Sequence, residues 1–217
     1  MKKTVIKGSP SDQVKFAEGL AISELSELRA ELQQLRDHPP LVKRGRGRYE
    51  GDILGFVKGL RISARLIYFL RNRLSGTGLD VSWGHLVTNG ESCSPECDVI
   101  IHTKGHIRHW NGGKEPIMDF KFVEPERVRA VVSCKSSLLG IDKTYPEKLK
   151  RHGVKHIFLF AECCRETQFE KLEKRAKNAG YLSLCCLYLI QKGPSPFKYD
   201  EVSYVDFGKA ILKAVEP

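Results

Sequence analysis

The chain has 217 residues, of which 41% are hydrophobic, so its length and composition exclude a disordered protein and fit one well-buried core. Lys plus Arg number 36 against 26 Asp plus Glu, and the net charge of +10 favours polyanionic partners such as nucleic acid. The sequence has no apolar run long enough to cross a bilayer and no signal peptide, which predicts a cytoplasmic protein without a membrane partner.

The first predicted element is a helix over residues 10 to 37, which Pro39 and Pro40 terminate. Its apolar stripe consists of leucines at spacings of three and four: Leu25, Leu28, Leu32 and Leu35. Such a stripe indicates either a short coiled coil that joins two copies as a homodimer or a helix packed on its own domain, and its brevity favours the second. We predict an N-terminal helical extension over residues 1–40 and a larger domain over residues 41–217.

A basic segment follows at residues 43 to 48, where the sequence reads Lys-Arg-Gly-Arg-Gly-Arg and predicts a flexible loop. A second helix is expected from about residue 49 to residue 74. One of its faces carries basic side chains at helical spacing. We predict that the loop and this face contact a phosphate backbone, although a solvated helix face is the alternative. The residues concerned are Arg44, Arg46, Arg48, Lys58, Arg61 and Arg65.

The pattern changes to strands after Gly76, and helices alternate with strands towards the C-terminus. Hairpin-linked strands followed by strand–helix alternation predict an α/β fold with a mixed central sheet flanked by helices. The strands are expected at 81–88, 98–102, 117–123, 128–135, 155–161 and 181–189. The helices are expected at about 145–152, 165–179 and 206–214.

Seven cysteines are present, and two pairs of them are sequence neighbours in or beside apolar segments. This odd number and this placement predict buried, reduced thiols rather than a disulfide framework. His102, His106 and His109 lie close in sequence to Cys93 and Cys97. Their spacing matches no standard zinc site, so a polar hairpin is the preferred interpretation.

The residues that indicate chemistry lie on two predicted neighbouring strands. Asp98 begins the strand at 98–102, and Lys135 ends the strand at 128–135. A carboxylate at such a position can hold Mg²⁺, and an ammonium beside it can stabilise the charge that develops on a phosphate. The pair therefore predicts metal-assisted hydrolysis of a phosphodiester.

These two segments resemble the PD-(D/E)XK, or restriction-endonuclease-like, nuclease superfamily. They are also similar to a family of bacterial domains of this type, whose motifs read Ser-Pro-Gln-Cys-Asp and Ala-Val-Ile-Glu-Val-Lys-Ser-Ser-Leu. Here the first motif reads Ser-Pro-Glu-Cys-Asp at residues 94–98. The second reads Ala-Val-Val-Ser-Cys-Lys-Ser-Ser-Leu at residues 130–138. The resemblance covers roughly residues 43 to 162.

The resemblance implies a restriction-endonuclease-like core and a nuclease that uses Mg²⁺, with Mn²⁺ as the alternative ion, and acts more readily on DNA than on RNA. It assigns Asp98 as a metal ligand and Lys135 as a catalytic residue. It further implies that the backbone carbonyl of Cys134 contacts the metal. By the same resemblance Glu50, near the start of the second helix, is a further metal ligand.

Ser133 stands where the family has an acidic residue, and a hydroxyl is a far poorer Mg²⁺ ligand than a carboxylate. An active enzyme would need a replacement acid, and Glu147 on the next predicted helix is one source. Thr144 and Glu147 also fit a capping box, in which Glu147 would bond a backbone N–H instead. Three functions therefore stay open: a nuclease, a catalytically inactive nucleic-acid-binding module with the same fold, and an interaction protein that uses the leucine-striped helix.

Overall fold

The computed structural model describes residues 43–44, 48–49, 51–88, 92–105, 108–109, 120–192, 197–199 and 201–215. The chain divides into two compact units, Met1–Tyr49 and Glu50–Pro217. The predicted helical extension, its leucine stripe and the homodimer that the stripe would form lie outside the described residues. The proposed boundary after residue 40 stays a prediction.

In the first unit, the basic segment is a small hairpin where the sequence predicted a flexible loop. Strands β1 (Lys43–Arg44) and β2 (Arg48–Tyr49) pair antiparallel, with Lys43 opposite Tyr49 and Arg44 opposite Arg48. The prediction was wrong because it considered only charge and glycine content.

The second unit contains a nine-stranded mixed sheet with the order β11-β10-β9-β8-β5-β3-β7-β6, and β4 pairs with β3 beside this path. Strands β3, β5 and β8 are antiparallel neighbours, whereas β8, β9 and β10 run parallel. The strands are β3 (Leu79–Thr88), β4 (Ser92–Cys93), β5 (Cys97–Thr103), β6 (Arg108–His109), β7 (Phe120–Val123), β8 (Val128–Ser137), β9 (Ile157–Arg165), β10 (Leu184–Ile190) and β11 (Phe197–Tyr199).

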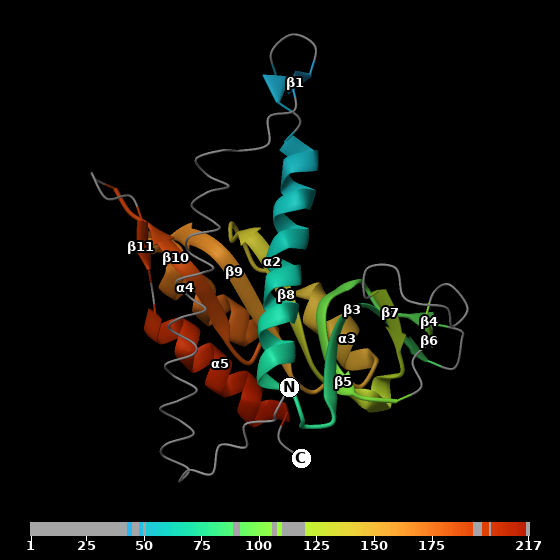
Figure 1. Ribbon diagram of the computed structural model, residues 1–217. Coiled ribbons are helices and arrows are strands. Elements are labelled where there is room, and N and C mark those ends of the chain that lie inside the picture. Colours follow the sequence, from blue (N-terminus) through green and yellow to red (C-terminus); the bar gives the residue numbers. More distant parts are fainter. Residues whose placement is uncertain are drawn as a thin grey trace, which may run out of the picture. The chain divides into compact units, whose positions relative to one another are not determined.

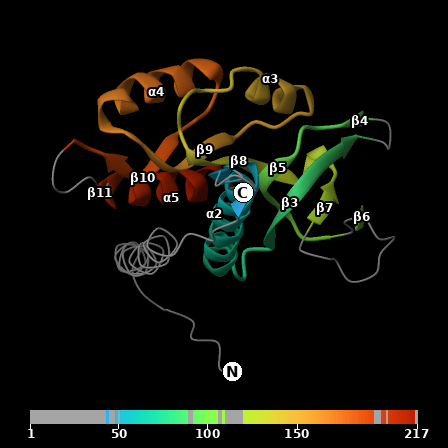
Figure 2. The ribbon, with the colours of Figure 1, turned by 90° about the horizontal axis from the view of Figure 1, so that it is seen from above.

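Helices cover both faces of this sheet, as Figures 1 and 2 show: α3 and α4 lie over one face, and α2 and α5 lie over the other. Their bounds are α2 (Gly51–Arg73), α3 (Thr144–Arg151), α4 (Glu166–Ala179) and α5 (Glu201–Val215), and the short 3₁₀ helix η2 (Pro125–Arg127) precedes β8. The mixed α/β architecture predicted from the sequence is therefore confirmed. No helix of the described segments is long and apolar enough to span a membrane.

The hydrophobic core lies on both sides of the central strands. On the α3/α4 side, Val131 and Ile157 of the sheet pack with Leu149 of α3 and Leu172 of α4, all of them buried. On the other side, Phe158 and Phe160 form ring contacts with Phe207 of α5. Strand β5 is buried on both faces at Val99, Ile100 and Ile101, as expected for a central strand.

The predicted state of the cysteines agrees with the structure. All seven thiols are free of disulfides, and six of them are buried while Cys93 is exposed. Cys163 and Cys164 lie on β9, and Cys185 and Cys186 lie on the neighbouring strand β10. These thiols behave as small apolar core residues, which is how free cysteine is most often used in a protein interior.

Candidate active site

Strand pairing brings the two sequence motifs together at one end of β5 and β8. Val99 is the register partner of Val132, so the antiparallel ladder continued by one residue places Asp98 opposite Ser133. The Oδ2 atom of Asp98 accepts a hydrogen bond of 2.7 Å from the backbone N–H of Cys134. The hydroxyl of Ser133 donates to the same oxygen at 3.4 Å. No hydrogen bond of Oδ1 occurs among the described residues.

Lys135 follows Ser133 by two positions and therefore shares its face of the strand. This face is the α3/α4 side, since Val131, two residues before Ser133, belongs to the core cluster there. The side chain of Lys135 is exposed, whereas Ser133 is buried. An accessible ammonium and a recessed carboxylate thus lie on one face at one end of the sheet.

The electrostatics of Asp98 reflect this position. Burial raises the pKa of Asp98, and the hydrogen bond from the Cys134 N–H and the positive charge of Lys135 lower it only in part, so the pKa stays above its ordinary value. Burial thus disfavours the charged form of this carboxylate, and the contacts with Cys134 and Lys135 offset only part of that cost. Functional sites, where charge is needed for chemistry rather than for stability, frequently show this pattern.

We expect Asp98→Asn to stabilise the protein, because the amide keeps a hydrogen-bond acceptor for Cys134 and carries no charge. A folded-state pKa above the unfolded value means that the charged form destabilises the fold, and this penalty grows as the pH rises from the ordinary carboxyl range through the folded pKa. Thermal unfolding should show a higher Tm for the variant at about pH 8 and a smaller difference near pH 4, in the ordinary carboxyl range. A lower Tm for the variant at the higher pH would contradict this account of Asp98.

The start of helix α3 is tied to the Asp98 strand through Tyr145. The hydroxyl of Tyr145 donates to the backbone carbonyl of Glu96 at 3.2 Å, just before β5. Burial raises the pKa of Tyr145, and the nearby Cys97 and Asp98 raise it further. Tyr145 therefore forms part of the wall around Asp98, and its phenol stays protonated.

Asp142 precedes α3 and caps it. Its Oδ1 atom accepts hydrogen bonds from the backbone N–H groups of Thr144 at 2.9 Å and Tyr145 at 3.2 Å, and from the Thr144 hydroxyl at 2.9 Å. Slight burial raises the pKa of Asp142, but these hydrogen bonds and the positive charge of Lys135 hold it below its ordinary value. The Asp142 side chain is exposed, and the positive charge of Lys135 is the smallest of these influences on its pKa.

The structure corrects the capping box expected at this helix. Thr144 is the first helical residue, and its hydroxyl donates to Asp142 instead of accepting a hydrogen bond from a later backbone N–H. Glu147 is exposed, whereas Pro146 and Leu149 are buried, so Glu147 lies on the solvent side of α3. Sequence inspection missed Asp142, although an Asp two residues before a Thr-led helix is a common N-terminal cap pattern.

The remaining predicted site residues are described only in part. Glu50 and Arg46 lie outside the described residues. The backbones of Arg44 and Arg48 are in β1 and β2, and the backbones of Lys58 and Arg61 are in α2, but their side chains are not described. Arg65 lies half-buried on α2. The predicted phosphate contacts of these residues stay proposals.

The histidines do not contribute a metal cluster within the described segments. His102 is fully buried; its Nδ1 donates to the carbonyl of Thr103 at 3.1 Å, which leaves Nε2 to accept from the Ser82 hydroxyl at 3.1 Å. Ser82 is equally buried, so this pair has no access to a substrate and is a satisfied core contact. No group of three or more His, Cys, Asp or Glu side chains that could hold a metal occurs in the part of the chain that is described.

The fold defines a structural class: the chain has a mixed α/β core with a central sheet flanked by helices, in which Asp98 lies at the start of one central strand and Lys135 near the end of its neighbour. No protein-family model and no curated protein matches the sequence. The fold is shared with solved structures, three of which are structures of NucC.

The first is NucC of E. coli MS115-1 in its apo form, with a TM-score of 0.50, 14% identity, and coverage of 76% of this chain and 91% of NucC. The second is cAAA-bound NucC of P. aeruginosa ATCC27853, with a TM-score of 0.51, 12% identity, and coverage of 96% and 91%. The third is cAAA-bound NucC of E. coli MS115-1, with a TM-score of 0.51, 11% identity, and coverage of 97% and 92%. At such low identity these likenesses establish the fold alone.

Proposed function

We propose that the protein is a metal-dependent nuclease that hydrolyses phosphodiester bonds, in DNA rather than RNA, with Asp98 and Lys135 at its active site. The observation that carries the proposal is the convergence of the two motifs: Asp98 is held by the backbone of Cys134, and the exposed ammonium of Lys135 stands on the same face of the sheet. The mixed α/β fold, which the chain shares with NucC, supports the proposal.

The donors around Asp98 fit Mg²⁺, or Mn²⁺ in its place, as an ion bound together with the substrate. Mg²⁺ is usually held by one or two carboxylates with substrate phosphates and water, rather than by a protein cage. The Oδ2 atom of Asp98 accepts hydrogen bonds from the backbone N–H of Cys134 and the hydroxyl of Ser133. Its Oδ1 atom makes no hydrogen bond among the described residues. A bound ion would supply Lewis-acid activation of the phosphate and of a water molecule.

Each residue of the proposed site would then have its own role. Asp98 would hold the ion through Oδ1, and the carbonyl of Cys134 would be its neighbour, because the N–H and C=O of one strand residue point to the same side. Lys135 would stabilise the negative charge that develops on the phosphate and orient the attacking water. The hydroxyl of Ser133 would keep the Asp98 carboxylate in position.

Two acids of the α3 region, together with Glu50 of the N-terminal part of the chain, are the sources proposed for the carboxylate that Ser133 lacks. Glu147 was proposed from the sequence, but it stands on the solvent side of the helix. Asp142 is exposed as well, but the positive charge of Lys135 lowers its pKa, and its backbone carbonyl accepts a hydrogen bond from the Tyr181 hydroxyl at 3.3 Å. We therefore propose Asp142, in preference to Glu147, as the source of the carboxylate that Ser133 lacks.

The experiment that tests the proposed function is incubation of the purified protein with supercoiled, linear and single-stranded DNA, and with RNA, in the presence of Mg²⁺, Mn²⁺ or EDTA. We expect cleavage of DNA in either ion and none in EDTA. Binding without cleavage in any ion would instead select the catalytically inactive nucleic-acid-binding module.

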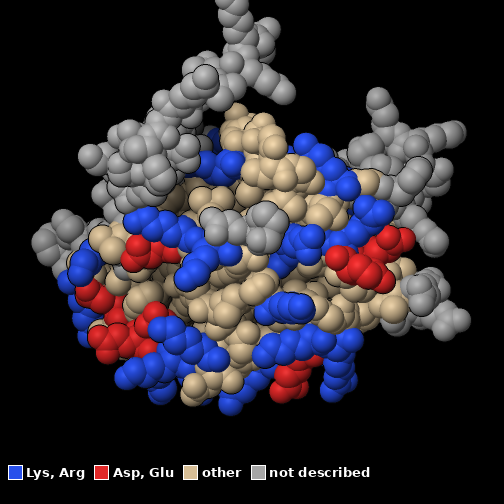
Figure 3. Space-filling model, turned by 90° about the horizontal axis from the view of Figure 1, so that it is seen from below, with Lys and Arg blue, Asp and Glu red and all other residues tan. Residues whose placement is uncertain are grey.

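Nucleic-acid binding itself is proposed to involve the basic hairpin and the basic residues of α2. On the face shown in Figure 3, which is seen from below, Lys and Arg side chains are spread over most of the surface and cover more of it than Asp and Glu do. Replacing Arg44, Arg46 and Arg48 together by glutamine should weaken DNA binding at all sequences alike and reduce the slope of log K against log salt by about 3, close to one unit per lost phosphate contact. An unchanged slope would exclude the hairpin from the interface.

A further inference from the structure

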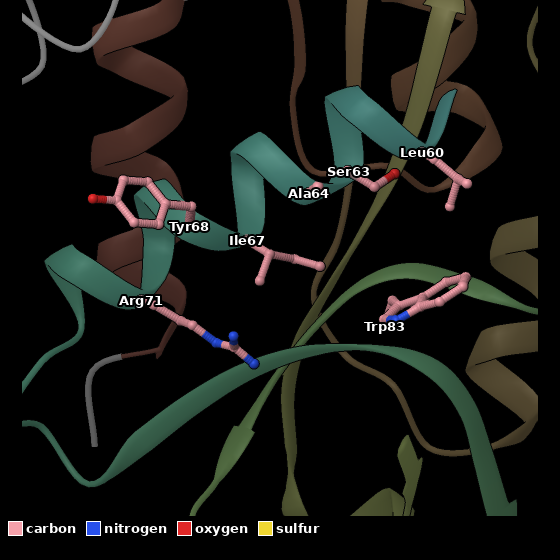
Figure 4. Close-up of a pocket in the computed structure, with 7 residues that line it drawn as sticks. All are labelled: Leu60, Ser63, Ala64, Ile67, Tyr68, Arg71 and Trp83. Carbon is pink, nitrogen blue, oxygen red and sulfur yellow. The ribbon is translucent and has the colours of Figure 1, made fainter. Parts of the chain in front are cut away.

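A cavity of about 400 Å³ lies between helix α2 and strand β3, lined by Leu60, Ser63, Ala64, Ile67, Tyr68, Arg71 and Trp83. Figure 4 shows Trp83 facing the helix from β3, with Ile67 between Trp83 and Arg71, and Tyr68 extending from α2 away from Trp83. The cavity exists because α2 carries the small residues Ser63 and Ala64 where it passes Trp83. The hydroxyl of Ser63 donates to the carbonyl of Gly59 at 3.1 Å, so it is turned back into the helix.

This cavity belongs to the opposite side of the sheet from Asp98 and Lys135. Trp83 faces α2, whereas Leu86, three positions along β3, belongs to the core cluster under α3 and α4. The proposed active site therefore does not extend into the cavity, and a ligand in the cavity could be present together with a substrate at Asp98.

The floor beside the cavity is aromatic. Strands β3 and β7 run parallel, with Trp83 opposite Phe120 and His85 opposite Phe122. The rings of Trp83 and Phe120 meet edge to face at 5.1 Å between centroids, and those of Phe120 and Phe122 do so at 5.5 Å. All four side chains are half-buried, so the row they form is accessible yet held in place by its own ring contacts.

Gly84 allows the two strands to come close enough for this row to form. Its φ of 142° lies where side-chain-bearing residues are rarely found, and a Cβ at this position would collide with the backbone of Lys121 on β7. Since Trp83 and His85 flank Gly84, the close approach of the strands fixes the positions of both rings.

Arg71 supplies the charge at the other end of the cavity. Its Nε donates to the carbonyl of Val81 at 2.8 Å and lies 3.4 Å from Asp80 Oδ1, so the guanidinium is held against β3 while about a third of the side chain stays exposed. A fixed guanidinium plane stacks on flat aromatic molecules and attracts phosphate. The cavity thus offers an indole, a phenol, an aliphatic floor and an immobilised cation.

We propose that this cavity, which we call the α2–β3 pocket, binds a nucleobase with its sugar-phosphate, by stacking on Trp83 near Arg71. Its volume lies near the lower end of the range of about 300–1,000 Å³ typical of small-molecule sites, which suits one nucleotide rather than a second protein element. Flat aromatic walls bind bases of any sequence by stacking, and the net charge of +10 favours an anionic ligand. The base could belong to a free nucleotide or to an unpaired position of a nucleic-acid strand.

Tryptophan fluorescence tests the pocket directly. The chain has two tryptophans, so Trp110→Phe leaves Trp83 as the single reporter. In EDTA, without cleavage, we expect saturable quenching of Trp83 by deoxyadenosine monophosphate if the ligand is a free nucleotide. Quenching by a short single-stranded oligonucleotide alone would identify an unpaired base in a strand. Deoxyribose 5-phosphate and an abasic oligonucleotide should not quench, because they lack the ring that stacks.

Filling the pocket provides the decisive variant. Ala64 is exposed and lines the pocket, so Ala64→Phe should raise the dissociation constant by about tenfold or more, the worth of one lost stacking contact. Asn72→Phe adds the same ring at an exposed position of α2 outside the lining and should change nothing. If Ala64→Phe unfolds, Tyr68→Ala at a side chain 61% exposed replaces it and should also weaken binding.

Three results would overturn the proposal: no saturable quenching by either ligand, equal quenching by the base-free probes, or unchanged affinity in the pocket variants. None of them depends on whether DNA is cleaved. A protein that binds nucleotides in the α2–β3 pocket but never cuts DNA would refute the proposed nuclease function and would support the pocket proposal. A protein that cuts DNA but binds no nucleotide in the pocket would refute the pocket proposal and leave the nuclease function supported.

Discussion

Replacing Lys135 with alanine should lower the rate of DNA cleavage by about 10²- to 10³-fold, the usual cost of removing one group that stabilises charge in a transition state. The side chain is exposed at the end of β8, so the fold should not depend on it. Loss of its positive charge should also raise the pKa of Asp98, to which Lys135 gives a favourable interaction. The pH at which cleavage reaches half its maximum should therefore rise in any residual activity.

Lys174→Ala on α4 is the matched control, because it removes another exposed lysine from the same unit. Single-turnover cleavage rates and thermal unfolding should be measured for both variants. Lys135→Arg should keep part of the activity, since it preserves the charge but not its geometry. A Lys135→Ala enzyme that cuts as fast as the Lys174→Ala enzyme would remove Lys135 from the site.

The second large effect concerns the acid that replaces the one missing at Ser133. We expect Asp142→Asn to reduce cleavage by roughly 10- to 100-fold, the range reported for losing a group that supports a metal site. Asparagine caps a helix as well as aspartate does, so α3 should keep its stability while the charge beside Lys135 is lost. The measurement is the cleavage rate as a function of Mg²⁺ concentration.

Glu147→Gln is the control, since it neutralises an exposed acid on the same helix without affecting the cap. Asp142→Ala should lose about 1 kcal/mol of stability in addition, as for other lost caps. If Glu147→Gln abolishes cleavage and Asp142→Asn does not, the acid is Glu147 in the first turn of α3, as the sequence analysis considered. If neither variant affects cleavage, α3 supplies no acid to the site.

The sequence predicted the sheet well where burial is continuous. The apolar runs at Val99–Ile101 and Val131–Val132 are buried on both faces of the sheet, so their strands could be recognised without knowledge of the partners. Short edge strands gave no such pattern. Strands β4, β6 and β11 contain only two or three residues each and depend on a neighbour that composition does not reveal.

The candidate site was predictable in part for the same reason. Asp98 and Lys135 lie on strands that pair directly, so finding the strands was enough to bring the residues together. Asp142, which we propose for the site, lies in a turn between β8 and α3, and the direction of such a turn depends on tertiary contacts such as that of Tyr145 with Glu96. The α2–β3 pocket was beyond prediction, because it requires a helix and a strand to pass each other at positions set by the whole fold.

Cleavage of supercoiled DNA by the wild-type protein and by Asp98→Asn, side by side in Mg²⁺, Mn²⁺ and EDTA, tests the central claim most directly. The variant keeps an acceptor for the Cys134 N–H and loses only the charge that would hold the ion. The wild-type protein should cut in either ion and not in EDTA, and the variant should be slower by at least about 10²-fold. Equal cutting by the two proteins, cutting in EDTA, or no cutting by the wild-type protein in any ion would contradict a metal-dependent nuclease centred on Asp98.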